Sequence, residues 1–175
     1  MKTTHRVAAL AALAALAGTA GATAQEVRED VTETIETFKS ANESMSRWFE
    51  DSHAYAVFPN VGKGGLIVGA GHGTGQVFRG GALIGEAEIS MLSVGLQIGG
   101  QEFSEVVFFQ NAEALGRLTG GKLEFGAGMS AIAVNEGAST GGAFRNGLAV
   151  FTRVKGGAMV EASVNGQKFD YKAYD

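Results

Sequence analysis

Glycine is distributed unevenly along this chain, and the distribution limits the folds that the chain can adopt. Of 27 glycines in 175 residues, two lie in the first 24 residues and the other 25 follow Val61, with none between Gln25 and Val61. Glycine weakens helices, whereas strands tolerate it at bulges, at bends and where another backbone approaches closely. The distribution therefore predicts a short leader, a helical stretch and a glycine-rich β body.

The leader, residues 1–24, has the layout of a secretory signal peptide. Lys2 and Arg6 precede an apolar run over residues 7–17, and small residues follow up to Ala24. The run of about 11 residues is too short for the roughly 20 that a membrane-spanning helix needs. We therefore expect cleavage near Ala24, rather than a retained anchor, and a periplasmic or secreted protein.

Charge and cysteine content exclude several functions. Cleavage would remove two basic residues and no acidic one, which leaves 12 Lys and Arg against 18 Asp and Glu, a net charge of −6. Nucleic acid is therefore not an expected partner, because its binding needs a basic face. The absence of cysteine excludes disulfides, thiol catalysis and thiolate metal sites.

Residues 25–52 predict one amphipathic helix, because apolar side chains recur there at steps of three or four. These side chains are Val27, Val31, Ile35, Phe38, Ala41, Met45 and Trp48. The opposite face is mainly acidic. Two interpretations of the stripe stay open: it packs on the β body, or it contacts lipid as an interfacial helix does.

Residues 53–175 predict an antiparallel β domain. Turn signals every ten or so residues and period-two alternation indicate about seven or eight strands in a strongly curved sheet or barrel. One short helix is expected at residues 111–118, and residues 106–109 (VVFF) predict a strand that is covered on both faces. The expected fold class is α+β, with the N-terminal amphipathic helix packed on the sheet.

Four local features of this domain are also predicted. A turn is expected at Pro59 and Asn60, and a hairpin turn at Asn165 and Gly166. A bulge is expected near Met91 and Leu92, where the apolar residues change from odd to even positions. Residues 123–133 alternate as a strand does.

Catalytic motifs are incomplete in this chain. Residues 137–141 (GASTG) match the G-x-S-x-G motif with Ser139 as nucleophile, but no histidine follows His72 to complete a triad. Asp51 and His53 make at most a weak metal pair. We therefore expect no enzyme activity, no cofactor and no metal site, with a hydrolase as the remaining catalytic alternative.

Several motifs, taken in series, resemble one known family. They are AVFPNVGKGG at 56–65, IVGAGHGTG at 67–75, VGLQIGGQ at 94–101, VVFFQN at 106–111, KGG at 155–157 and VEASVNG at 160–166. Their order and spacing over residues 53–174 are similar to those of the SYLF domain, also called the Ysc84-like domain. The amphipathic stretch also stands where that family has its N-terminal amphipathic segment.

The resemblance implies a non-catalytic lipid-binding module with phospholipid or another lipid at a membrane surface as its partner. The implied lipid-binding residues are Val27, Val31, Ile35, Phe38, Met45, Trp48 and, for a headgroup, Lys63. Eukaryotic members bind phosphoinositides and actin filaments, but an acidic helix and export argue against both ligands here. A small outer-membrane β-barrel or a structural envelope protein is the alternative, although one Trp and three Tyr provide little for aromatic girdles.

Overall fold

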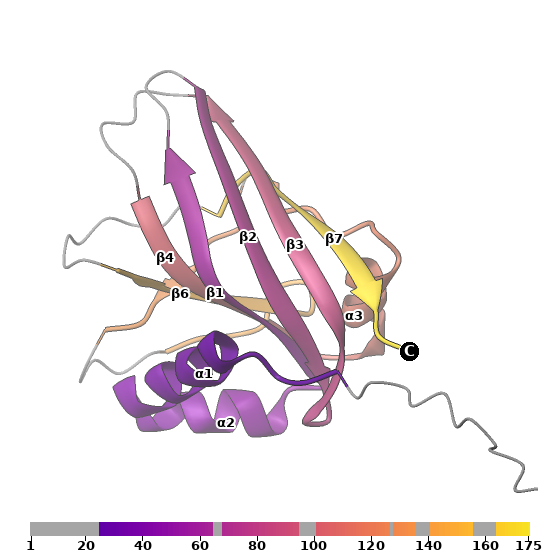
Figure 1. The fold of residues 1–175 in the computed structure, drawn as a ribbon. Coiled ribbons are helices and arrows are strands. Elements are labelled where there is room, and N and C mark those ends of the chain that lie inside the picture. The colour runs from indigo at the N-terminus through magenta and orange to yellow at the C-terminus, as the bar shows by residue number, and fades with distance from the viewer. Residues whose placement is uncertain (1–24, 65–67, 95–100, 127, 136–140, 156–163) are drawn as a thin grey trace, which may run out of the picture.

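The computed structural model describes residues 25–64, 68–94, 101–126, 128–135, 141–155 and 164–175 (Figure 1). Within them the helices are α1 (Glu29–Ala41), α2 (Glu43–Asp51) and α3 (Ala112–Thr119). The strands are β1 (Ala54–Gly64), β2 (Val68–Arg79), β3 (Ala82–Val94), β4 (Gln101–Phe109), β5 (Ile132–Ala133), β6 (Leu148–Val154) and β7 (Gln167–Ala173). The predicted signal peptide and Ser139 lie outside the described residues.

The seven strands form one sheet in the order β5-β6-β4-β1-β2-β3-β7. Neighbouring strands are antiparallel except β5 and β6, which are parallel. Among the described residues, the edge strands β5 and β7 do not pair with each other, so the sheet is open. The α+β class is therefore confirmed, whereas closure into a barrel is not.

The sheet curls strongly enough to bring distant strands into contact. Three strands separate β4 from β7, and in a flat sheet this separation would place them about 19 Å apart. Yet Gln167 Nε2 on β7 donates to Glu105 Oε2 on β4 over 2.8 Å. The rings of Phe58 on β1 and Phe169 on β7 also approach, with centroids 5.9 Å apart. Strong curvature, as predicted, therefore accompanies the open edges.

Two apolar clusters cover the two faces of the curled sheet. Along β4, Phe103, Val107 and Phe109 belong to one cluster, while Val106 and Phe108 belong to the other. The first cluster is completed by α3 and by residues 123–125, and the second by α1 and α2. The prediction that residues 106–109 are covered on both faces is confirmed.

The prediction of a single helix over residues 25–52 is wrong, because two helices form there. α1 ends at Ala41, and Asn42 adopts an extended conformation with φ −158° and ψ 131°. The Asn42 side chain then accepts a hydrogen bond from Ser44 N over 2.8 Å, which caps the start of α2. Figure 1 shows the two helices beside each other at one end of the sheet. The later helix was predicted correctly and is α3.

Pro59 and Asn60 do not form a turn between strands, as the sequence suggested. They lie inside β1, where the pairing register with both β2 and β4 shifts between Val57 and Val61. The shift places one extra β1 residue opposite the neighbouring strands, which is a β-bulge. A bulge is one of the few positions in a sheet that accept proline, since its nitrogen cannot donate to the ladder.

The bulge predicted near Met91 and Leu92 is also misplaced. β3 pairs with β2 in unbroken register from Gly85 to Val94, and the extra residue is Ile84, between Leu83 and Gly85. Because Gly85 carries no side chain, the change of face at this bulge leaves no mark in the apolar pattern.

The strand expected over residues 123–133 is largely irregular. Glu124 makes one isolated bridge to Lys168 of β7, and only Ile132–Ala133 form a strand. Gly128 between them has φ +96° and interrupts an extended conformation. At the other predicted turn, Gly166 has φ +79° just before β7, while the strand expected before it lies in part outside the described residues.

Candidate functional site

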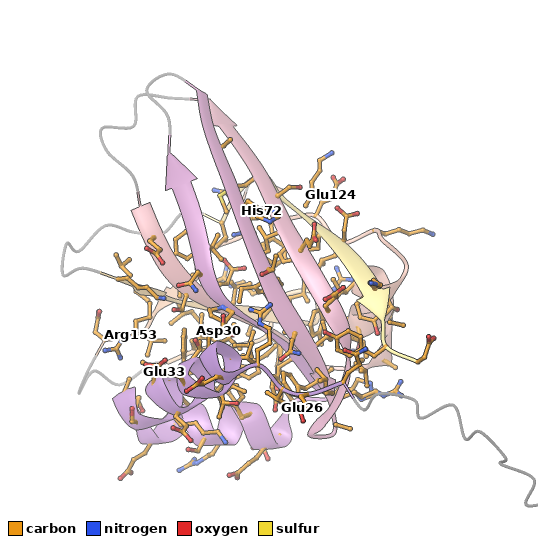
Figure 2. All side chains as sticks on the ribbon, in the orientation of Figure 1. Glu26, Asp30, Glu33, His72, Glu124 and Arg153 are labelled. Atoms are coloured by element: carbon orange, nitrogen blue, oxygen red, sulfur yellow. The ribbon has the colours of Figure 1, made fainter. Side chains whose placement is uncertain are left out.

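The candidate lipid site is the interface between the α1–α2 pair and one face of the sheet, here called the helix-covered face. Its buried helix side chains are Val31, Phe38, Ala41, Met45 and Phe49, and its buried sheet-side residues are Val57, Phe78, Val106, Phe108, Val134, Ala149 and Phe151. The helices present polar side chains on the opposite side. Asp30 and Glu33 of α1, labelled in Figure 2, do not belong to this apolar cluster.

Aromatic rings fill the α2 half of the helix-covered face. The Trp48 ring has its centroid 5.6 Å from that of Phe108 and 4.9 Å from those of Phe144 and Phe151. Phe49 meets both Tyr55 and Phe108 at 5.0 Å. Edge and tilted contacts of this kind add to the area that the rings bury.

Tyr55 provides the polar edge of this aromatic cluster. Its ring stacks on Phe78 with centroids 5.0 Å apart, and burial raises the pKa of its phenol above the usual value of 10.0. The Tyr55 phenol is therefore uncharged at neutral pH, and the cluster contains no ionised ring.

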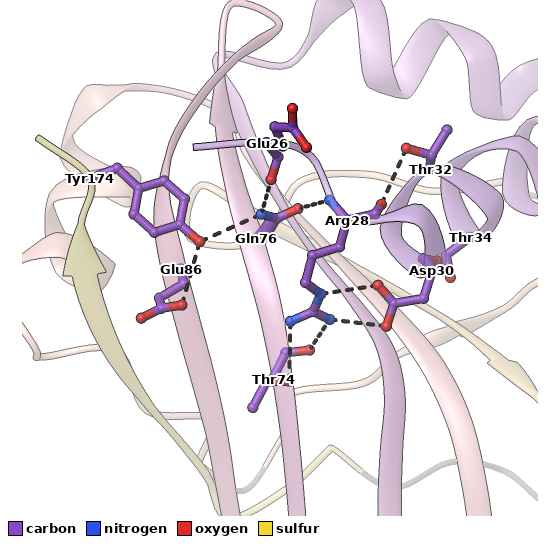
Figure 3. Close-up of polar contacts among 9 residues, drawn as sticks. All are labelled: Glu26, Arg28, Asp30, Thr32, Thr34, Thr74, Gln76, Glu86 and Tyr174. Atoms are coloured by element: carbon purple, nitrogen blue, oxygen red, sulfur yellow. Dashed lines mark hydrogen bonds and ion pairs between the residues drawn. The ribbon is translucent and has the colours of Figure 1, made fainter. Parts of the chain in front are cut away.

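A strap of residues 26–28 joins the start of α1 to strand β2 (Figure 3). Gln76, only 1% exposed, makes both backbone connections. Its Oε1 accepts from Arg28 N over 2.9 Å, and its Nε2 donates to Glu26 O over 3.0 Å. The amide thus pairs with the strap as a neighbouring strand would, and it fixes where α1 begins.

Arg28 strengthens the same connection through its side chain. Its guanidinium donates to Thr74 O and Oγ1 on β2, each over 3.3 Å, and pairs with Asp30 in the first turn of α1 at 3.0 Å. Both partners of the ion pair are more than one third exposed, so its free-energy contribution is small. The bonds to Thr74 are long and exposed, whereas those of Gln76 are shorter and partly buried, so Gln76 contributes most to holding the strap on β2.

A cleft of about 240 Å³ borders α1 on the side of the β1 bulge. Asp30 and Glu33 line it from α1, and Arg153 and Lys155 line it from the end of β6 and the residue that follows. Figure 2 places Arg153 on the same side of the molecule as Glu33. Opposite charges therefore face each other across the edge of the helix-covered face, which favours the docked position of α1.

The structure brings together five of the seven residues predicted to bind lipid. Val31, Phe38 and Met45 are fully buried in the helix-covered face, and Ile35 and Trp48 pack against the same cluster while partly buried. The interpretation that the stripe packs on the β body therefore describes this state of the protein.

Val27 and Lys63 lie apart from those five residues. Val27 precedes α1 and is 43% exposed. Lys63 belongs to β1, where its register partners are Gly71 on β2 and Gln101 on β4. The side chain of Lys63 lies outside the part that the structure describes, so its role as a headgroup contact stays a prediction.

Three residues of the interface were missed from the sequence. Phe49 is buried because α2 restarts the helix and places it four residues after Met45, one turn along the same face. Thr34 is 7% exposed, and its hydroxyl donates a hydrogen bond to Asp30 O over 2.7 Å. Gln76 gave no signal beyond being a polar residue before the apolar pair at 77–78.

Comparisons with known proteins do not assign the chain. Neither a scan against protein-family models nor a search of curated proteins finds a match. Within the described residues, the helices are too short and too polar to cross a membrane, and no three His, Asp or Glu side chains gather as metal ligands would.

Proposed function

We propose that this chain is an exported, non-catalytic lipid-binding module of the SYLF type, periplasmic or secreted after cleavage near Ala24. In this proposal the α1–α2 pair leaves the sheet and places its apolar stripe among acyl chains at a membrane surface. One observation carries the proposal: both helices bury their apolar side chains on an aromatic sheet face while their opposite side is polar. That is the division of surface that an interfacial helix needs.

The energetics of this exchange predict weak and reversible binding. Val31, Phe38, Met45 and Phe49 are buried in the docked state, and each large apolar side chain gains about 1.5–3 kcal/mol from burial. Undocking therefore costs about 6–12 kcal/mol before any lipid is bound. Burial of the same side chains among acyl chains releases a similar free energy. The net free energy of binding is therefore a small difference between two large contributions.

The first test is the substitution Ile35→Asp. Ile35 lies on the stripe but is only partly buried, so its replacement perturbs the docked fold less than a change at the fully buried Phe38. An aspartate there would have to enter the acyl region with its charge, which is strongly unfavourable. We expect vesicle binding to fall at least tenfold in flotation with mixed phosphatidylcholine and phosphatidylglycerol vesicles.

The matched control for Ile35→Asp is Thr32→Asp, which adds the same charge on an exposed position of α1. Thr32→Asp is expected to bind vesicles as the unchanged protein does, and circular dichroism establishes that both variants are folded. If a folded Ile35→Asp protein floats with the vesicles as well as the unchanged protein, the stripe does not contact lipid.

A second test loosens the strap. The substitution Gln76→Leu removes both backbone hydrogen bonds that hold residues 26–28. Each such bond contributes about 0.5–1.5 kcal/mol, so opening of α1 becomes easier by roughly 1–3 kcal/mol. We expect stronger vesicle binding, about fivefold or more, together with faster amide hydrogen exchange in α1.

The control for Gln76→Leu is the same change at Gln110, which is exposed just after β4. Gln110→Leu is expected to change neither hydrogen exchange in α1 nor vesicle binding. Faster exchange in Gln76→Leu without any gain in binding would show that helix opening is not a step of lipid association.

A further inference from the structure

A second hollow, away from the helix-covered face, lies between α3, the β2–β3 hairpin and the end of the chain. It is a pocket of about 410 Å³. His53, Arg79, Tyr171 and Tyr174 contribute polar groups to its lining, and Leu83 and Leu115 are among its apolar residues. No Asp or Glu is among the described residues that line it. A volume of this size lies within the range of small-molecule sites, about 300–1,000 Å³.

The walls of this pocket are fixed by the Ile84 bulge. Ile84 O accepts one hydrogen bond from Tyr171 Oη over 2.9 Å and another from Tyr174 N over 3.1 Å. The bulge therefore holds both tyrosines of the C-terminal segment against the start of β3. The fixed polar groups are typical of a binding site that exists before its ligand arrives.

The charge of the pocket is opposite to that of the chain. The whole sequence has a net charge of −4, but Arg79 and His53 face this hollow without a lining carboxylate. Glu86 on β3 accepts from Tyr174 Oη over 3.4 Å, but it also pairs with Lys172 at 3.4 Å, so a cation already balances it.

Arg79 and Tyr171 lie close enough to interact electrostatically. Burial raises the pKa of the Tyr171 phenol, and the positive charge of Arg79 opposes part of that rise. Both side chains also line the pocket. Arg79 is itself exposed, so its fork of N–H donors is accessible to a ligand.

We propose that this pocket binds a small oxyanion that carries an apolar body, with Arg79 as its charge partner. The planar guanidinium pairs with the oxyanion, because its fork of N–H donors matches two oxygens of a carboxylate or a phosphate. The tyrosine rings and the leucines contact the apolar body. The oxyanion belongs either to a soluble molecule or to a lipid headgroup, and the site does not require the helix exchange described above.

The probe is phenyl phosphate, titrated into the full chain and followed by the amide NMR signals of residues 171–174. We expect saturable shifts of those signals. The substitution Arg79→Gln should raise the dissociation constant at least tenfold, because it removes a charge-assisted pair. Its matched control, Arg47→Gln, changes an exposed arginine of α2 outside the pocket and should leave the constant within twofold.

A second variant keeps the test independent of the arginine. Thr119→Glu places a carboxylate on the pocket wall at an exposed position of α3, and charge repulsion should weaken phenyl phosphate binding by a similar factor. Amide spectra of each variant establish that it is folded. The proposal is overturned if uncharged phenol binds as tightly as phenyl phosphate, if no saturable shift occurs, or if both pocket variants bind normally.

Vesicles identify the source of the oxyanion. Binding to phosphatidylglycerol vesicles that requires Arg79 supports a headgroup. Phenyl phosphate binding that requires Arg79, together with vesicle binding that does not, supports a soluble ligand. The Ile35→Asp protein separates this site from the proposed lipid exchange, because it should still bind phenyl phosphate as the unchanged chain does.

Discussion

Replacing Glu105 with glutamine is expected to stabilise the protein at pH 8 by roughly 3–5 kcal/mol and to leave its stability at pH 4 nearly unchanged. Glu105 lies on β4, inside the curled sheet, and is fully buried. Burial raises the pKa of its carboxyl from 4.5 to about 8, and the hydrogen bond from Gln167 opposes only part of that rise.

The sign of the effect follows from the two pKa values of Glu105. Below pH 4.5 the carboxyl is neutral in the folded and the unfolded chain, so the fold carries no penalty. Between pH 4.5 and about 8 the unfolded chain releases the proton while the folded chain keeps it, and stability falls as pH rises. Above pH 8 both states are ionised and the loss is complete.

The hydrogen-bonding pattern around Glu105 also favours the neutral acid. Glu105 Oε1 and Gln167 Oε1 are both buried acceptors without a partner. A proton on Glu105 converts one of its oxygens into a donor, which an ionised carboxylate cannot offer. A glutamine at 105 has an amide donor at every pH, so it removes the dependence on ionisation.

Urea unfolding at pH 4, 6 and 8 measures this effect, with the fluorescence of Trp48, the single tryptophan, as the probe. The matched control is Glu102→Gln, an exposed carboxyl on the same strand that pairs with Lys155 at 3.8 Å. Its pH profile should follow that of the unchanged protein. A Glu105→Gln protein that loses stability with pH as steeply as the unchanged protein would show that Glu105 is already ionised in the fold.

Burial of Glu105 could have been predicted from the alternation of β4. Phe103, Val107 and Phe109 occupy odd positions of the strand, and Glu105 shares their face. What the sequence could not reveal is the partner, because Gln167 is 62 residues away. That contact depends on the curl of the whole sheet and not on any local pattern.

The helical stripe was predictable for the residues that are truly helical. Steps of three and four residues placed Val31, Phe38 and Met45 on one face, and all three are fully buried. Val27 failed because α1 begins only at Glu29, so helical periodicity does not apply to it. The break at Asn42 was not predicted either, because a single extended residue leaves the apolar spacing nearly intact.

The bulges of the sheet were the least predictable feature. At Ile84 the neighbouring glycine hides the change of face, and at Pro59 the proline suggested a turn. Asn146 and Gly147, with φ +51° and +77°, form a tight turn just before β6, although apolar residues at the even positions 144, 148 and 150 favour one uninterrupted strand across it. The sequence therefore predicts which face a residue occupies along a regular strand, but it does not predict where a strand contains an extra residue.

Gly75→Ala is expected to destabilise the protein by about 2–4 kcal/mol, although adding one methyl group in a strand is usually harmless. Gly75 lies on β2 opposite the β1 bulge, between residues that pair with Val57 and Asn60. A Cβ at this position would lie 2.4 Å from Val57 O and 2.5 Å from the Phe58 ring. A backbone oxygen cannot rotate away, so the bulge itself would have to move.

Gly62→Ala is the matched control for Gly75→Ala, because Gly62 lies on the adjacent strand β1 with no atom within 4 Å of an added Cβ. Its stability in urea should change by less than about 0.5 kcal/mol. Equal stabilities of the two variants would mean that β1 has room to relax around residue 75. A large loss of stability in Gly75→Ala alone would instead show that the β1 bulge requires a glycine at this position of β2. That bulge contributes Pro59 and Asn60 to the cleft beside α1, so one glycine constrains the edge along which the helices dock.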